Sequence, residues 1–202
     1  MSVATTSVPV SGGTLYVTTI SDHNDVVAAT QSFVPTAAGG GMDRFLMLTR
    51  ALSIAGIPLT ATPAAGAFGI TRTDGTSLVL TGEATSGAAA KTDQAIWEVN
   101  LSDSYIAGHD IALTVNCNTV GTVITAASTT LTPTAYSQSD GVETGLTVSA
   151  AQQIPATATD LVFTITGTGL TPGMSIVVVL TMLVTTSSGA AHGVINSVAL
   201  TM

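Results

Sequence analysis

The sequence predicts an all-β protein, a jelly-roll-like two-sheet β-sandwich preceded by an extended N-terminal arm. The main observation is that short runs of Val, Ile, Leu and Thr recur from Thr76 to the C-terminus, separated by turn-forming Gly, Pro, Asn and Asp. These runs amount to about eight strands, at spacings typical of a sandwich or jelly roll. A second observation is that the first 42 residues contain too little apolar sequence to form a core of their own. We therefore divide the chain into an arm (1–42), a linking segment (43–75) and a β-sandwich (76–202).

Residues 1–42 have the composition of an arm ordered by a neighbour, either as an extended segment or as an added strand. A short alternating run, Thr14–Ile20, is followed by the polar segment Ser21–Asp25 and then by Gly39–Gly41. The polar segment includes His23 between acidic and amide residues, which raises the question of a metal site. Four adjacent residues cannot all point at one ion, and no second acidic cluster completes a ligand shell. We expect a turn here and no metal.

The linking segment leaves its secondary structure open. Met42–Gly56 has apolar residues three and four positions apart, as in a helix, but it can also be read as two short strands. Three of the 4 basic residues of the chain fall here, at Arg44, Arg50 and Arg72. In so acidic a chain they form a local positive patch, and we take them as candidate intersubunit contacts with an acidic surface.

Within the sandwich, two residues are predicted to lie in the core. Trp97 falls on the apolar phase of the alternating run Gln94–Leu101, so we expect it to point inward. Cys117 falls in the alternating run Ile111–Cys117 and is the single cysteine of the chain. It cannot form an intramolecular disulfide, and we expect a small buried side chain.

The C-terminal stretch, from Asp160 to Met202, predicts three strands in succession. The turn-forming segment Gly167–Gly173 separates the first two, and small residues separate the last two. We expect an antiparallel meander. Its middle run, Ser175–Thr185, is almost continuously apolar, which predicts a strand covered by a second sheet on one face and by a loop or another subunit on the other.

Composition excludes several classes of partner. Only 8% of residues are charged, against a usual fraction of about 25%, and the net charge is −8. Nucleic acid is not an expected partner, because neutralising phosphates requires clustered basic residues. No membrane span is expected, since the longest apolar run is far too short to cross a bilayer as a helix. The N-terminus has no signal-peptide pattern, so we expect folding in a cytoplasm.

No catalytic constellation appears in the sequence. His23, His109 and His192 fall in separate segments without metal-ligand spacing, and the acidic residues of the sandwich form no acid–base pair. We expect neither an enzyme nor a cofactor. Tyr105 and Tyr136 fall in predicted loops, and they are the candidate sugar contacts if the chain is a carbohydrate- or receptor-binding module of a phage head fibre or tail.

The segments Ala107–Val115 and Asp160–Met202 resemble strands of the jelly-roll decoration proteins found on the heads of tailed bacteriophages. The resemblance implies a viral structural protein, a capsid decoration or cement protein on the outer surface of the virion. It further implies a homotrimer that clamps neighbouring major capsid proteins. The low surface charge is consistent with such a role, because small and hydroxyl side chains lose little hydration when they pack against a neighbour.

Overall fold

The computed structural model describes residues 2–10, 13–21, 32–35, 43–46, 48–73, 77–122, 124–139 and 142–202. The chain divides into two compact units, Met1–Met42 and Asp43–Met202. Every regular element in the described ranges is a β-strand or a single turn of 3-10 helix. The all-β prediction is therefore confirmed.

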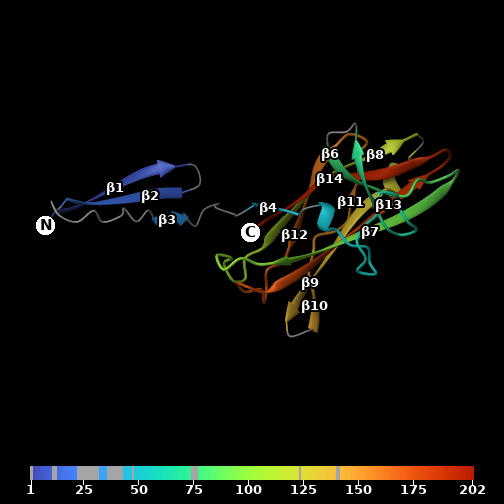
Figure 1. The fold of residues 1–202 in the computed structure, drawn as a ribbon. Helices are drawn as coiled ribbons and strands as arrows, with labels where there is room; N and C mark the ends of the chain where they lie inside the picture. The colour runs from blue at the N-terminus through green and yellow to red at the C-terminus, as the bar shows by residue number, and fades with distance from the viewer. Residues whose placement is uncertain are drawn as a thin grey trace. The chain divides into compact units, whose positions relative to one another are not determined.

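The first unit contains a three-stranded antiparallel sheet in the order β1-β2-β3 (Figure 1). Its strands are β1 (Ser2–Val10), β2 (Gly13–Ser21) and β3 (Ser32–Pro35). β1 and β2 pair along their whole length, from Ser2 opposite Ser21 to Val10 opposite Gly13. The described part of the predicted arm thus pairs with itself, which satisfies backbone groups that an isolated extended segment would leave to a neighbour. The polar segment around His23 lies outside the described residues.

The second unit is built from two antiparallel sheets. The first has the order β10-β9-β13-β7, with β11 also paired to β9; the second has the order β12-β8-β14-β6-β5, with β4 also paired to β14. The strands of the first sheet are β7 (Ala89–Asn100), β9 (Thr130–Ser139), β10 (Val142–Leu146), β11 (Gln152–Gln153) and β13 (Ser175–Thr186). Those of the second are β4 (Asp43–Phe45), β5 (Gly69–Thr73), β6 (Ser77–Thr81), β8 (Ile111–Gly121), β12 (Thr159–Ile165) and β14 (Ala191–Thr201).

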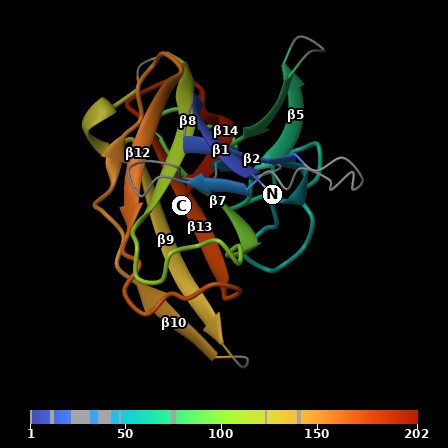
Figure 2. The same ribbon diagram turned by 90° about the vertical axis from the view of Figure 1, so that its left-hand side faces the viewer.

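The strand order is that of a jelly roll. Successive strands cross from one sheet to the other at β6–β7, β7–β8 and β8–β9, and again at β11–β12, β12–β13 and β13–β14. This alternation places β6-β14-β8-β12 in one layer and β7-β13-β9-β10 in the other, which are the two four-stranded layers of a jelly roll. Figure 2 shows β9 and β13 running side by side, with β10 at one end of the sheet.

The predicted C-terminal meander is wrong. β12 and β14 lie in the second sheet, both beside β8, whereas β13 lies between β7 and β9 in the first. The runs are strands, as predicted, but each connection crosses the sandwich instead of turning back beside its predecessor. Their pairing partners lie much earlier in the chain, on β4 and β6 to β9, and local sequence does not reveal them.

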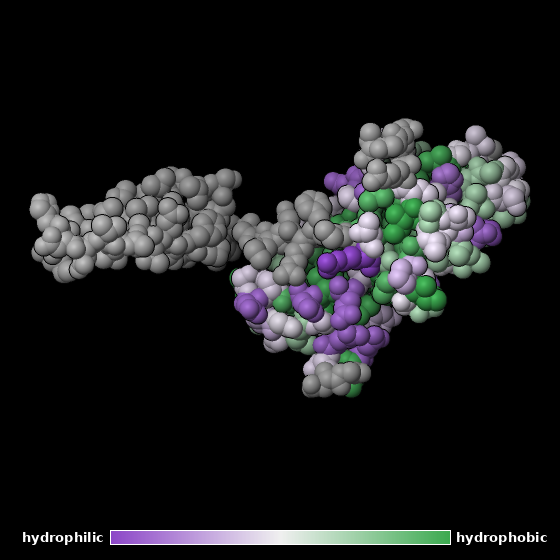
Figure 3. All heavy atoms as spheres, viewed as in Figure 1, coloured by the Kyte–Doolittle hydropathy of each residue, from purple (hydrophilic) through white to green (hydrophobic). Residues whose placement is uncertain are grey.

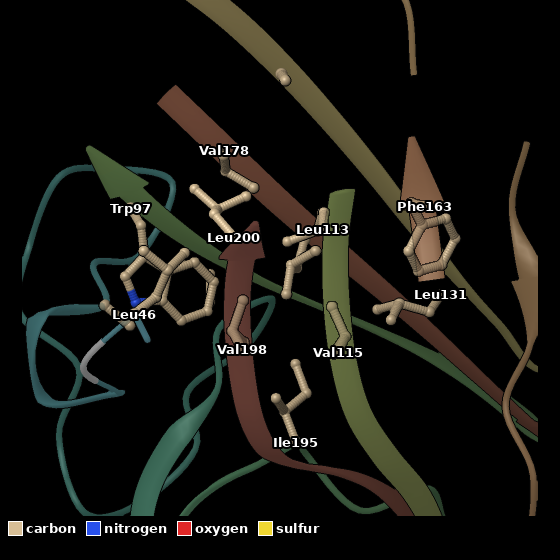
Figure 4. Packing of buried hydrophobic residues seen from close by; sticks show 14 of the residues in the cluster. Leu46, Trp97, Leu113, Val115, Leu131, Phe163, Val178, Ile195, Val198 and Leu200 are labelled. Atoms are coloured by element: carbon tan, nitrogen blue, oxygen red, sulfur yellow. The ribbon is translucent and has the colours of Figure 1, made fainter. Parts of the chain in front are cut away.

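The core lies between the two sheets. Along β8, inward residues Ile111, Leu113, Val115 and Cys117 are fully buried, and they alternate with half-buried outward residues. Figure 4 shows Leu113 and Val115 among side chains of the other strands, with Trp97 beside Leu46. The predictions that Cys117 and Trp97 lie in the core are confirmed, since their exposed fractions are 0% and 2%.

The central strand β13 is buried on its inner face and partly covered on its outer face. The inward residues from Ile176 to Val184 are buried, while most outward residues are half-buried and Val179 is 7% exposed. Among the residues that the structure describes, none therefore forms the complete cover of the outer face of β13 that the apolar run predicts.

The segment 43–75 belongs to the second unit. It contains both short strands and one turn of 3-10 helix, Leu48–Arg50 (η1). β4 pairs with the end of β14, and the chain then runs along the free edge of β7. There Leu52 and Ile96 exchange two backbone hydrogen bonds, of 2.9 and 2.8 Å, and the Gln94 N–H donates to the Gly66 carbonyl at 3.1 Å. This segment therefore covers the β7 edge that would otherwise be free for pairing with another chain.

Candidate functional site

Tyr105, one of the two predicted sugar contacts, is buried. Its exposed fraction is 4%, and its hydroxyl donates a hydrogen bond to the backbone carbonyl of His109. Its loop, between β7 and β8, turns back so that the ring packs into the core cluster. Burial and the nearby Asp110 carboxylate raise the pKa of its phenol. Tyr105 is a structural residue, and its prediction as an exposed contact is wrong.

Tyr136, the other predicted contact, is half-buried and belongs to a strand instead of a loop. It lies in the middle of β9, opposite Val177 of β13 on one side and Gly145 of β10 on the other. Ala135 and Ser137, its neighbours in the strand, are buried. Because residues of a strand alternate between its two faces, Tyr136 lies on the outer face of the first sheet, away from the core.

The register identifies the side chains that share this outer face with Tyr136. Residues directly opposite each other in antiparallel strands lie on the same face of the sheet, with neighbouring strands about 4.8 Å apart. The row through Tyr136 therefore contains Glu98, Val177 and Gly145. Glu98 is exposed and Val177 is half-buried, so the tyrosine has an apolar neighbour toward β13 and a carboxylate two strands away.

The next row along the sheet consists of polar side chains, and we call it the polar row: Asn100, Ser175, Gln138 and Glu143. Its members are joined in pairs. Gln138 Nε2 donates to Glu143 Oε1 at 3.0 Å, and the Ser175 hydroxyl donates to Asn100 Oδ1 and, at 3.4 Å, to Glu98 Oε1. These hydrogen bonds hold the amide, hydroxyl and carboxylate groups in fixed orientations next to Tyr136.

On the opposite side of Tyr136 the outer face becomes less polar. Val179 and Ile96 are paired there, with Thr134 exposed beside them. One row further on, Gln94 Nε2 donates to Thr181 Oγ1 at 2.9 Å. In Figure 3, hydrophilic residues gather over the region of β9 and β10, next to more apolar surface. The outer face thus combines one aromatic ring with an apolar floor and several oriented polar groups.

The candidate intersubunit arginines do not belong to this outer face. Arg44 lies on β4 and Arg72 on β5, both in the second sheet, and the structure does not describe their side chains. Arg50 is exposed in the 3-10 helix that precedes Leu52, on the β7 side of the first sheet. Arg44 and Arg50 are close in sequence, whereas Arg72 is on a strand that pairs only with β6 among the described strands.

The sequence singles out Tyr136 as a candidate sugar contact, but it does not show which residues lie next to it. Glu98 and Asn100 fall on the polar phase of the alternating run Gln94–Leu101, but their meeting with Gln138, Ser175 and Glu143 depends on pairing between strands far apart in the sequence. No group of three or more His, Cys, Asp or Glu residues that could hold a metal ion occurs in the part of the chain that the structure describes. None of the helical segments among the described residues is long and apolar enough to cross a membrane.

The histidines that the structure describes stand apart from this site. His109 is exposed in the loop before β8, and His192 lies on β14 in the second sheet. Burial lowers the pKa of His192. Neither residue shares the outer face of the first sheet, so neither supplies acid–base chemistry beside Tyr136.

Comparison with known proteins gives structural similarity only. No protein-family model matches the chain, and no curated protein matches it. Among solved structures, a carbohydrate-binding module of the β-sandwich superfamily is similar with a TM-score of 0.44 and 11% identity, over 98% of this chain and 74% of the other. A xylan-binding domain from Paenibacillus barcinonensis is similar with a TM-score of 0.41 and 17% identity, over 82% of this chain and 97% of the other. At these identities and TM-scores the similarities do not indicate a function for this chain.

Proposed function

We propose that this protein is a carbohydrate-binding module that binds a glycan on the outer face of the sheet β10-β9-β13-β7. The observation that carries the proposal is the half-buried ring of Tyr136 next to the polar row. Sugars present apolar C–H faces that stack on aromatic rings and hydroxyls that need donors and acceptors. Binding sites for small polar molecules combine these two kinds of contact, an aromatic or apolar surface and a few oriented polar groups.

The arrangement supports binding without catalysis. Glu98 and Glu143 lie on β7 and β10, with β9 and β13 between them and in neighbouring rows, so their backbones are about 16 Å apart. Each carboxylate accepts a hydrogen bond from a neighbouring polar side chain. Such positions serve to accept hydrogen bonds from sugar hydroxyls, and Gln138 and Asn100 supply amide groups beside them.

The experiment that tests this proposal is a glycan array followed by titration calorimetry with the most strongly retained glycan. Removing the ring in Tyr136→Ala should weaken binding by about fivefold or more, because an aromatic contact contributes about 1 kcal/mol or more. Tyr136→Phe keeps the ring and should retain most of the affinity. Val162→Ala, on the exposed face of the other sheet, is the matched control. Retention of no glycan by the full-length protein would refute the proposal.

A second candidate function is capsid decoration, with a homotrimer clamping neighbouring major capsid proteins on the virion surface. The observation that favours it is the separate unit Met1–Met42, which precedes a jelly roll in a chain with only 4 basic residues. Such a unit could attach to a neighbour while the jelly roll occupies the joint between subunits. Light scattering should then give the mass of a trimer, and the trimer should bind empty heads and raise their resistance to heat. A monomer that does not bind heads would contradict this function.

A further inference from the structure

The side of Tyr136 that faces β10 carries no side chain. The residue opposite it there is Gly145, and a Cβ added at this glycine would meet no atom within 4 Å. The φ of Gly145 is outside the left-handed range that favours glycine. Glycine in a strand interior is unfavourable, and here neither the backbone conformation nor close packing requires it. The result of having glycine at this position is open space next to the tyrosine ring.

The opposite side of Tyr136 is closed. Val177 lies directly across from it on β13, half-buried, and the next outward residue of that strand, Val179, is 7% exposed. A flat molecule that stacks on the tyrosine therefore has room over β9 and β10 and meets apolar side chains toward β13.

Two polar residues border this open position. Gln138 and Glu143 are two residues from Tyr136 and Gly145 along their strands, so all four lie on the same face of the sheet. Gln138 Nε2 donates to Glu143 Oε1 at 3.0 Å. The amide oxygen can accept a hydrogen bond, and an ionised carboxylate can accept several. Together they offer acceptors to the hydroxyls of a molecule that lies over Tyr136 and Gly145.

The charge at this position is negative. Glu143 is exposed, about 7 Å along the strand from Gly145. Among the described residues of this face none is Lys or Arg. Arg50 is on the β7 side, and β7 is three strand spacings, or about 14 Å, from β10. This separation exceeds the Debye length of about 8 Å at physiological ionic strength, so Arg50 does little to offset the charge of Glu143.

We infer that the Tyr136–Gly145 pair is the contact for one sugar residue without a carboxylate, sulfate or phosphate group, stacked over β9 and β10 with its hydroxyls on Gln138 and Glu143. The inference rests on the proposed glycan binding and specifies where the sugar lies and which class of sugar is accepted. An anionic sugar at this position would be repelled by Glu143 and by the net charge of −8.

The position is tested by filling the space beside the ring. Gly145→Leu places a branched side chain next to Tyr136, and it should weaken binding of the strongest array glycan by about tenfold while leaving the unfolding midpoint unchanged or higher. Thr144→Leu adds the same side chain at the preceding residue, on the other face of the same strand, and should leave binding unchanged. Unchanged binding by Gly145→Leu, together with loss of binding by Tyr136→Ala, would overturn the inference and leave the proposed function standing.

The class of sugar is tested on an array that pairs each neutral glycan with its carboxylated or sulfated counterpart. Neutral members should bind about tenfold more tightly than their acidic counterparts at low salt, as expected for one like charge at about 7 Å. The ratio should shrink in 0.5 M NaCl and in Glu143→Gln. Equal or tighter binding of the acidic members would overturn the inference. If the array retains no glycan at all, the proposed function itself is refuted. That result differs from unchanged binding by Gly145→Leu and from tighter binding of acidic glycans, which would overturn only the inference.

Discussion

Asp93 on β7 accepts a hydrogen bond from the backbone N–H of Glu83, at 3.0 Å from nitrogen to Oδ2, while its Oδ1 is buried without a hydrogen-bond partner. The residue is 1% exposed, on the inner face of the sandwich. Burial raises the pKa of the Asp93 carboxyl from its ordinary value of 3.8 to about 6, and the Glu83 N–H opposes this rise. The nearby Lys91–Glu83 ion pair, at 2.6 Å, is partly exposed and adds little stability.

The raised pKa of Asp93 predicts that this residue destabilises the fold as pH increases. Between about pH 4 and pH 6 the folded protein keeps the proton while the unfolded chain has lost it. The contribution of Asp93 to the free energy of unfolding therefore falls through this window, by up to about 3 kcal/mol, and stays at its minimum above it. Urea unfolding at pH 4, 5 and 7 measures this dependence.

The variant Asp93→Asn isolates the effect from other acidic groups. It has no charge to bury and retains an oxygen for the Glu83 N–H, so we expect it to be more stable than the natural protein at pH 7 by about 2–3 kcal/mol. At pH 4 the difference should be close to zero. A variant that is less stable at pH 7 would show that the ionised carboxylate has a favourable partner.

A second prediction concerns the thiol of Cys117. This residue is fully buried on β8, and burial raises the pKa of its thiol to about 12, with Asp160 adding to the rise. Since the thiolate is the reactive form, the native protein should not react with a chromogenic disulfide reagent at pH 8. Unfolding in guanidinium should expose Cys117, so that one thiol per chain reacts with the reagent. Rapid reaction of the native protein would contradict the burial of Cys117.

The sequence predicts those features of the fold that depend on residues close together in the chain, and not those that depend on residues far apart. The alternation of apolar and polar residues identifies most strands, and it orients Trp97 and Cys117 correctly, because the period of two is a local property. The predicted meander fails because β13 pairs with β7 and β9, whose paired residues are 37 to 97 positions earlier in the chain. Which strand crosses to which sheet is decided by packing of the whole sandwich.

The candidate site shows the same limit. Tyr136 is recognisable as one of few aromatic residues, but its position in a strand opposite Gly145 follows only from the register of β9 and β10. Tyr105 is equally visible in a polar loop, and nothing local shows that the loop folds back to bury it. For these two tyrosines the local sequence therefore predicts the chemistry of the side chain, but neither its exposure nor its neighbours.

A third prediction concerns the hydroxyl of Tyr105. Tyr105→Phe removes the hydrogen bond to the His109 carbonyl but keeps the buried ring, so the free energy of unfolding should fall by about 1 kcal/mol. Glycan binding should be unchanged, because Tyr105 lies in the core and not on the outer face. Urea unfolding and titration calorimetry on the same preparation check both statements. Loss of binding without loss of stability would return Tyr105 to the candidate sugar contacts.

A fourth prediction concerns Gly167, which closes the same corner of the sandwich. A Cβ at Gly167 would lie 1.8 Å from the His109 carbonyl oxygen and 2.7 Å from the Tyr105 hydroxyl, and the Gly167 N–H donates to Asp110 Oδ1 at 3.0 Å. Gly167→Ala must therefore move backbone, and we expect a loss of about 3 kcal/mol or more in the free energy of unfolding. Gly145→Ala is the matched control, since its added methyl group meets open space and should cost nothing. Equal stability of the two variants would show that the corner at His109 relaxes freely, and that its close packing does not hold the loop between β7 and β8 in place.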